Sequence, residues 1–92
     1  MSLRVEFAPP AAAQVRALPP GIRVAVLRDV TTLADDPIGG PPRVKRLHGL
    51  APPTYRLRSG SHRVIYRLVG ETVVVLAVID RKNLDRTIRR LR

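Results

Sequence analysis

Hydrophobic and polar residues alternate along several short stretches of the chain, and a period of two is typical of half-buried β-strands. Clear alternation occurs in residues 3–7, 55–58 and 62–69, and a further short strand is expected within residues 44–48. Residues 72–79 (TVVVLAVI) are apolar on both faces and are therefore expected to form the central strand. Short turns join the last three strands, so consecutive strands are predicted to pair antiparallel.

Two segments between the first and second predicted strands have the pattern of a helical hairpin. Residues 11–18 are rich in Ala and end at Pro19, while Pro20 suits the first turn of a second helix, where its missing N–H costs nothing. Apolar residues at 4, 4, 3 spacing predict the buried face of this second helix, which comprises Ile22, Val26, Val30 and Leu33. Arg23 and Asp29 are expected to point outward.

The C-terminal residues add one more helix and complete the predicted fold. Leu84, Ile88 and Leu91 follow a 4, 3 spacing and predict a short amphipathic helix. The predicted fold class is α+β, with an N-terminal strand, a helical hairpin, an antiparallel sheet of three to four strands and a short C-terminal helix. Residues 1–92 are expected to form a single domain. The hairpin should cover one face of the sheet and leave the charged side chains on the other.

Charge is distributed unevenly along the chain. Residues 1–40 contain as many acidic as basic residues, whereas residues 41–92 carry the whole net charge of +10. Fold stability does not require this asymmetry, so it indicates a polyanionic partner, and nucleic acid is the commonest polyanion in a cell. The chain has only three aromatic residues, which are too few for a base-stacking platform, so recognition should depend on phosphate contacts.

Several other classes of protein lack support in the sequence. There is no Cys, and no group of His or acidic residues has metal-ligand spacing, so we expect no disulfide, metal or other cofactor. The glycines lack the spacing of a phosphate-binding loop. No apolar run approaches the roughly 18 residues of a membrane span, and no signal-peptide pattern is present. We therefore expect a cytoplasmic protein without membrane contact.

Four arginines in the basic half are candidates for chemistry. Arg56 and Arg58 lie two residues apart on one predicted strand and share a face, and Arg63 on the next strand is expected beside them. Arg81 directly follows the central strand. Guanidinium groups this close repel one another unless an anion lies between them, which favours a phosphate site. Each arginine taken singly is more simply explained as a solvated residue, and Asp80 as a partner of a nearby cation or a cap of the last helix.

An arginine site of this kind suits RNA cleavage, because RNA carries its own nucleophile in the 2′-hydroxyl group. Cationic side chains would stabilise the charge that develops on the phosphate, and a general base and a general acid would each add about 10²–10⁴-fold. The sequence offers few proton carriers, since His48 and His62 are more simply explained as turn or core residues.

Several motifs follow one another in order between residues 43 and 86. They are the sequence RLHG at residues 46–49, YRLR, a short Gly turn, HRVIY, a Val-rich strand and a basic strand end. This succession resembles the RelE/ParE superfamily of type II toxin–antitoxin toxins, and the Leu-Pro-Pro sequence at residues 18–20 extends the resemblance loosely. The resemblance implies a RelE-like fold related to microbial ribonucleases.

The RelE branch implies an endoribonuclease, an mRNA interferase that cleaves mRNA on the ribosome and so inhibits translation. The catalytic residues that this resemblance implies are Arg56, Arg58, Arg63, Arg81 and Asp85. Arg63 and Arg81 would stabilise the transition-state phosphate, and the other two arginines would orient the substrate. Asp80 stands where the family has a His and Asp85 where it has a Tyr, so one of the two carboxylates would replace these groups. The substrate-binding residues would be Lys45, Arg46, Arg67 and Lys82.

The same resemblance implies the partners. A cognate antitoxin would dock on exposed apolar residues of the terminal helix and on the sheet edge. The targets would be mRNA and the ribosome, and DNA would be contacted only indirectly, through the antitoxin complex. The alternative is the ParE branch, which shares the fold and inhibits DNA gyrase without nuclease activity. ParE toxins typically lack the full arginine set, so the four arginines favour the RelE branch.

Overall fold

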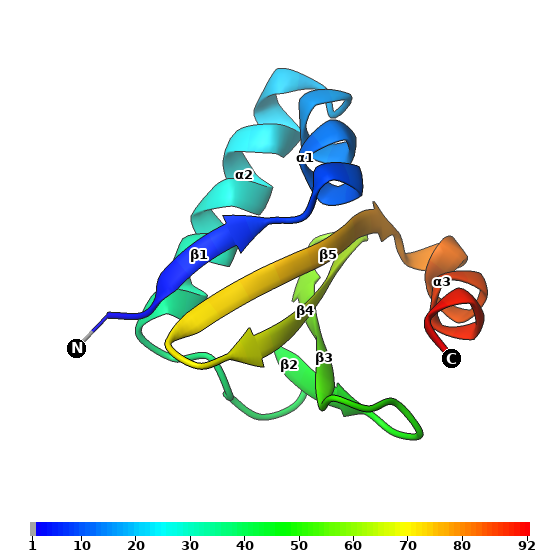
Figure 1. Ribbon diagram of the computed structural model, residues 1–92. Coiled ribbons are helices and arrows are strands. Elements are labelled where there is room, and N and C mark those ends of the chain that lie inside the picture. The colour runs from blue at the N-terminus through cyan, green and yellow to red at the C-terminus, as the bar shows by residue number, and fades with distance from the viewer. Residues whose placement is uncertain (1) are drawn as a thin grey trace.

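The computed structural model describes residues 2–92, which form one sheet with helices on both of its faces (Figure 1). The strands are β1 (Arg4–Phe7), β2 (Val44–Leu47), β3 (Thr54–Ser59), β4 (His62–Val69) and β5 (Thr72–Asp80). The helices are α1 (Pro9–Arg16), α2 (Pro20–Thr31) and α3 (Leu84–Leu91), with 3₁₀ turns η1 (Thr32–Ala34) and η2 (Arg81–Asn83). Within these residues, no helix has the length and apolar character needed to cross a membrane. The predicted α+β fold is confirmed.

The sheet contains five strands in the order β1-β5-β4-β3-β2. The four strands that follow the helical hairpin pair antiparallel, as predicted. The first strand was expected to precede an antiparallel sheet, but it joins that sheet as a parallel neighbour of β5, with Cα partners from Arg4–Thr72 to Phe7–Val75. The sheet is therefore mixed. β5 has a neighbour on each edge, as its apolar pattern predicts, although β4 rather than β5 lies in the middle.

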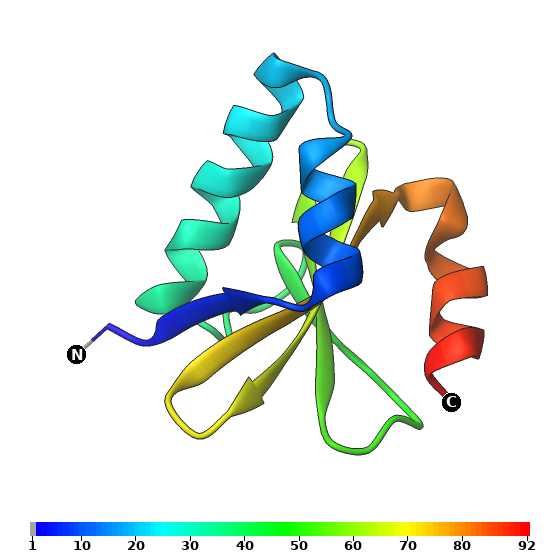
Figure 2. The ribbon, with the colours of Figure 1, turned by 45° about the horizontal axis from the view of Figure 1, so that its top comes forward.

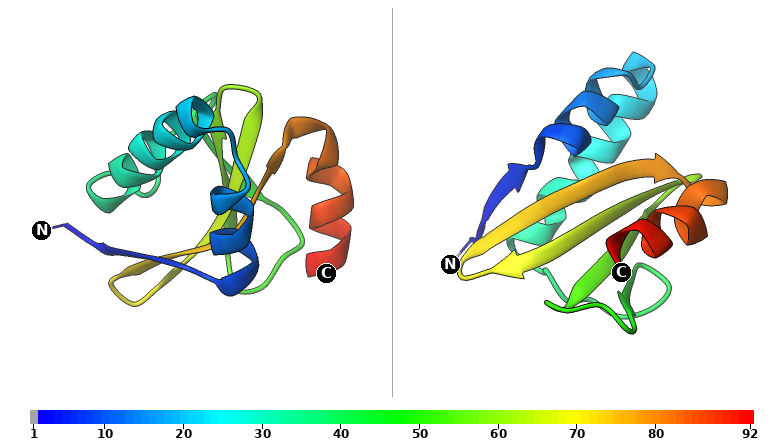
Figure 3. Two further views of the ribbon diagram at one scale, coloured as in Figure 1. Left: turned by 90° about the horizontal axis from the view of Figure 1, so that it is seen from above. Right: turned by 45° about the vertical axis from the view of Figure 1, so that its right-hand side comes forward.

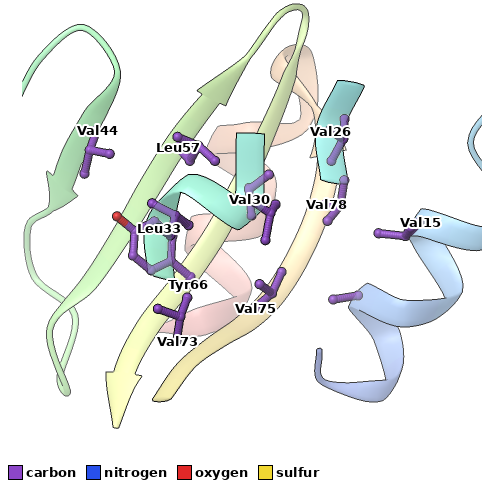
Figure 4. Close-up of a cluster of buried hydrophobic side chains, with 12 residues drawn as sticks. Val15, Val26, Val30, Leu33, Val44, Leu57, Tyr66, Val73, Val75 and Val78 are labelled. Carbon is purple, nitrogen blue, oxygen red and sulfur yellow. The ribbon is translucent and has the colours of Figure 1, made fainter. Parts of the chain in front are cut away.

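Helices α1 and α2 pack on one face of the sheet and enclose the main hydrophobic core (Figures 2 and 4). Val26, Val30 and Leu33 are buried against side chains of β3, β4 and β5. Tyr66 at the centre of this core is fully buried, and its hydroxyl donates a hydrogen bond of 2.5 Å to the carbonyl oxygen of Pro37. Burial raises the pKa of this phenol, so it stays protonated and keeps the loop after η1 attached to the core.

Three residues of α2 differ from the expectation. Ile22, predicted to be in the buried stripe, is 40% exposed. Arg23 does not point outward: its guanidinium donates to three carbonyl oxygens at the end of α1, those of Val15, Arg16 and Leu18. Asp29 accepts a 2.7 Å hydrogen bond from the hydroxyl of Ser59. These two side chains therefore join α2 to α1 and to β3.

Helix α3 covers the middle of the opposite sheet face, where a second cluster of buried residues lies (Figure 3). The alternation along residues 62–69 predicts that Ile65 shares a face with Arg63 and Arg67, and it does, but it is 0% exposed. It is packed with Ala77 and with the half-buried apolar stripe of α3, which comprises Leu84, Ile88 and Leu91. The face that carries the arginines is therefore covered by α3 over its middle. The apolar stripe of α3 needs a surface to cover, and the arginines occupy the rest of the face.

Candidate functional site

The hairpin of β3 and β4 sets the positions of three arginines. Its turn is short, and Gly60 adopts φ 57°, in the left-handed region that favours glycine. The register makes Arg58 and Arg63 direct Cα partners, as the sequence predicts, and sets Arg56 opposite Ile65. Because Leu57 and the other alternate residues point into the main core, these three arginines share the face on which α3 packs.

The fourth arginine reaches the same place from β5. The backbone N–H of Arg81 donates to the carbonyl oxygen of Ser61 at 2.9 Å, which brings the end of β5 to the tip of the hairpin. We call Arg56, Arg58, Arg63 and Arg81 the arginine cluster. The guanidinium of Arg63 donates to the carbonyl oxygens of Gly60 at 3.0 Å and His62 at 2.9 Å, so it is held in position against the turn.

The pKa of Arg63 shows that the four arginines of the cluster are close enough for their charges to interact. Desolvation by burial lowers the pKa of its guanidinium below the usual value. Three neighbouring positive charges lower this pKa further, namely those of Arg56, Arg58 and Arg81, while the carboxylate of Asp80 opposes them. The ion pairs found among residues 2–92 are Arg28–Asp29 and Arg43–Asp36, and neither involves the cluster. A bound phosphate would relieve the repulsion and accept charge-assisted hydrogen bonds.

Asp80 caps the 3₁₀ turn η2 that follows β5, and not the last helix α3, as the sequence suggested. Its side chain accepts a 3.0 Å hydrogen bond from the backbone N–H of Lys82. This hydrogen bond lowers the pKa of the Asp80 carboxyl, against an opposing effect of desolvation, and nearby positive charges lower it too. A carboxylate that is already engaged and readily ionised is a poor proton carrier near neutral pH.

The role of Asp80 as a cap predicts how stability changes with pH. Since the pKa is lowered in the folded state, the ionised carboxylate stabilises the protein above about 3.9, the usual pKa of an unfolded Asp, and this contribution is lost as pH falls through the folded-state pKa. Asp80→Asn should therefore reduce the free energy of unfolding at neutral pH and leave it unchanged in strong acid. Urea unfolding of both proteins at the two pH values measures this. A difference that persisted in strong acid would contradict the charge-based effect.

The remaining predicted site residues lie at different distances from the cluster. Lys45 on β2 is the Cα partner of Arg56 and adjoins the cluster, and Lys82 is exposed directly after Arg81. Arg67 is four residues from Arg63 along β4, about 13 Å at the usual rise of a strand. Its guanidinium donates to the hydroxyl of Thr54 at 3.0 Å, so it belongs to the other end of the face.

Two predicted residues have surroundings of their own. Arg46 is the Cα partner of Tyr55 and directly follows Lys45 on β2, so the two side chains point to opposite faces of the sheet. Arg46 lines a groove at the β2 edge together with His48. Asp85 is exposed in the first turn of α3 and lines a hollow with Ile88, Arg89 and Arg92. The carboxylate whose charge acts on Arg63 is that of Asp80 and not that of Asp85.

A groove that the sequence pattern does not indicate lies on the side of the β3–β4 turn that faces α2. It lies between residues 21–29 of α2 and the tip of the β3–β4 hairpin, and we call it the α2 groove. His62 lines it, half-buried and on the face opposite Arg63, as alternation predicts. Asp29 lines it as well, although the helical pattern had directed this residue to solvent. An Asp one residue before a buried Val in α2 was the only signal in the sequence.

The fold is similar to that of several RelE toxins of known structure. A chain of the RelBE2 toxin–antitoxin complex of Mycobacterium tuberculosis is 29% identical, with a TM-score of 0.75 over 87% of this chain and 99% of that chain. A chain of the archaeal RelE–RelB complex of Pyrococcus horikoshii is 26% identical, with a TM-score of 0.72 over 88% and 97%. A free mutant of the E. coli toxin RelE, 17% identical with a TM-score of 0.65 over 100% of both chains, shares the fold.

The family model described as the ParE toxin of the type II toxin–antitoxin system parDE matches residues 5–84. The chain therefore belongs to this family of toxins, and the predicted membership of the RelE/ParE superfamily is confirmed. A comparison with curated protein sequences gives no match.

Proposed function

We propose that this toxin is a RelE-like mRNA interferase, an endoribonuclease that cleaves mRNA on the ribosome and arrests translation. The observation that carries the proposal is the arginine cluster, four guanidinium groups at one end of a sheet face with no ion-pair partner among residues 2–92. In the reaction, the 2′-oxygen of the RNA attacks the adjacent phosphorus and the bond to the 5′-oxygen breaks. The products are a 2′,3′-cyclic phosphate and a new 5′-hydroxyl end.

The cluster supplies charge stabilisation in this proposal. Arg58 and Arg63 are direct partners across the hairpin and would bind the non-bridging oxygens, whose negative charge grows in the transition state. Arg81 would approach from the end of β5. Arg56, whose guanidinium donates to the carbonyl oxygen of Pro42 at 2.8 Å, would orient the RNA backbone together with Lys45. Catalysis then rests on positioning and electrostatics, and the engaged state of Asp80 gives no support for a strong general base.

A gyrase inhibitor is the second candidate, and the family match favours it. The matching model is that of the ParE toxin, and ParE toxins resemble RelE toxins in fold. If the toxin inhibits gyrase, the arginine cluster would be a docking surface for that enzyme, and the toxin would cleave no phosphate ester.

Mapping nucleic-acid ends after induction of the toxin in cells tests both candidates. The interferase should produce new 5′-hydroxyl ends within translated mRNA, and co-expression of a cognate antitoxin should abolish them. We propose such an antitoxin as the partner because the relatives in the RelBE2 and RelE–RelB structures are in complexes of that kind. Intact mRNA together with accumulated cleaved DNA would refute the interferase and support gyrase inhibition.

A further inference from the structure

The α2 groove has the size of a site for a small ligand group. Its volume of about 380 Å³ is typical of small-molecule sites. One wall is apolar, formed by Ile22 and Ala25 of α2 over the buried Val26. Ile22 is 40% exposed at this wall, an unusual position for an Ile in the register of a buried stripe. An apolar wall of this kind suits the face of a flat ring.

Among the residues that line the groove, Asp29 provides the one carboxylate. The carboxylate of Asp29 is held by the nearly buried hydroxyl of Ser59, which donates to one of its oxygens at 2.7 Å. A carboxylate accepts up to about four hydrogen bonds, so this fixed group can accept more from a ligand. The nearest cation is Arg28, with Nε 3.9 Å from the other oxygen of Asp29 and a side chain that is 73% exposed. The hydroxyl of Ser61 and the imidazole of His62 complete the rim.

The α2 groove and the arginine cluster lie on opposite sides of the turn between β3 and β4. The guanidinium of Arg63 is bonded to the carbonyl oxygens of Gly60 and His62, and the N–H of Arg81 to that of Ser61. All three turn residues also line the groove. A phosphate bound by Arg63 would therefore lie next to the rim, and the nucleotide beside it can place its base over the tip of the hairpin.

We infer that the α2 groove binds the base of a nucleotide adjacent to the scissile phosphate, and that Asp29 selects a base with an exocyclic amino group. This inference rests on the proposed function. Guanine fits best, because its neighbouring ring N–H and amino group can donate to both oxygens of one carboxylate. Uracil presents carbonyl oxygens where the amino-bearing bases present donors, and these oxygens are repelled by Asp29.

The charge of Asp29 also bears on the other occupants of the groove. An acidic protein segment is the natural complement of a chain with net charge +10, but its carboxylates would meet that of Asp29 inside the groove. A bare phosphate meets the same repulsion. A neutral ring with N–H donors is therefore the favoured occupant, and a protein segment becomes an outcome for experiment.

The test compares the bases that flank the mapped mRNA cuts made by the wild type and by Asp29→Asn. We expect the wild type to prefer an amino-bearing base at one flanking position by at least about fivefold, the lower end for a good base contact. Asn presents a donor as well as an acceptor, so Asp29→Asn should flatten this preference. The matched control is Asp35→Asn, because Asp35 also accepts a hydrogen bond from a serine hydroxyl, that of Ser2, but is exposed outside the groove. It should keep the wild-type preference.

Ala25→Leu provides a second variant in case Asp29→Asn fails to fold. It fills the apolar wall, keeps both partners of the Ser59–Asp29 hydrogen bond in the chain, and should also flatten the base preference. Cuts with an unchanged base distribution in both variants overturn the inference and leave the interferase standing. A wild type that makes no mRNA cuts refutes the proposed function and this inference together. Loss of protection by antitoxin with unchanged base preference would assign the groove to a protein segment instead.

Discussion

Replacing Arg63 by Ala should slow mRNA cleavage by about 10²–10³-fold, the usual loss when one pre-positioned donor to a developing negative charge is removed. Arg63 is the centre of the arginine cluster: its pKa responds to the charges of all three other members, and it faces Arg58 directly across the hairpin. Its guanidinium is also fixed by two carbonyl oxygens, so it needs little reorganisation to meet a phosphate. Cleavage of a model mRNA on purified ribosomes measures the rate.

The control for Arg63→Ala must remove one positive charge elsewhere. Arg4→Ala does so on the edge strand β1, where Arg4 pairs with Thr72 at the start of β5, the end away from Arg81, and it should leave the rate within a few-fold of the wild type. Arg63→Ala also removes two hydrogen bonds to the turn, so thermal unfolding of each variant must show that the protein remains folded at the assay temperature. A folded Arg63→Ala protein with the activity of the wild type would contradict the assignment of the cluster as a catalytic site.

The arrangement of the cluster could be predicted from the sequence because it depends on local rules. Strict alternation in β3 and β4 and a short Gly turn between them set Arg58 opposite Arg63 with no long-range information. The place of Arg81 beside the other arginines could be predicted as well, because a short turn pairs β5 with β4 and Arg81 directly follows β5. What the alternation could not show is how far the basic face extends, since α3 returns from the end of the chain to cover its middle.

The features that were missed depend on contacts between residues far apart in sequence. The parallel pairing of β1 with β5 joins residues 4–7 to residues 72–75. The sequence of a strand of four residues does not indicate which other strand it pairs with. Arg23 and Asp29 lie at polar positions of α2, and the helical pattern assigns such positions to solvent. They are turned to α1 and β3 because unpaired helix carbonyls and a nearly buried Ser59 hydroxyl are available there. The α2 groove, which depends on these contacts, was therefore not predictable.

Two isoleucines test the packing of α3 on the sheet most directly, because the sequence pattern and the structure place each of them in opposite environments. Ile22 belongs to the predicted core stripe of α2 but is 40% exposed, whereas Ile65 belongs to the predicted charged face but is 0% exposed. Ile65→Ala should lower the free energy of unfolding by about 2–5 kcal/mol, since it removes buried methyl groups and leaves a cavity beneath α3. For a domain of this size the melting temperature should fall by roughly 10 °C or more.

Ile22→Ala is the matched control, with the same atoms removed from a position that is already open to solvent. It should change the free energy of unfolding by no more than about 0.5 kcal/mol, because no closed cavity forms and Ala favours the helix. Urea and thermal unfolding of both variants give the comparison. Equal losses for the two, or a larger loss for Ile22→Ala, would mean that α3 does not pack on the sheet in solution. The whole face of Ile65 would then be open to a partner, and the arginine cluster would be one end of a longer exposed surface.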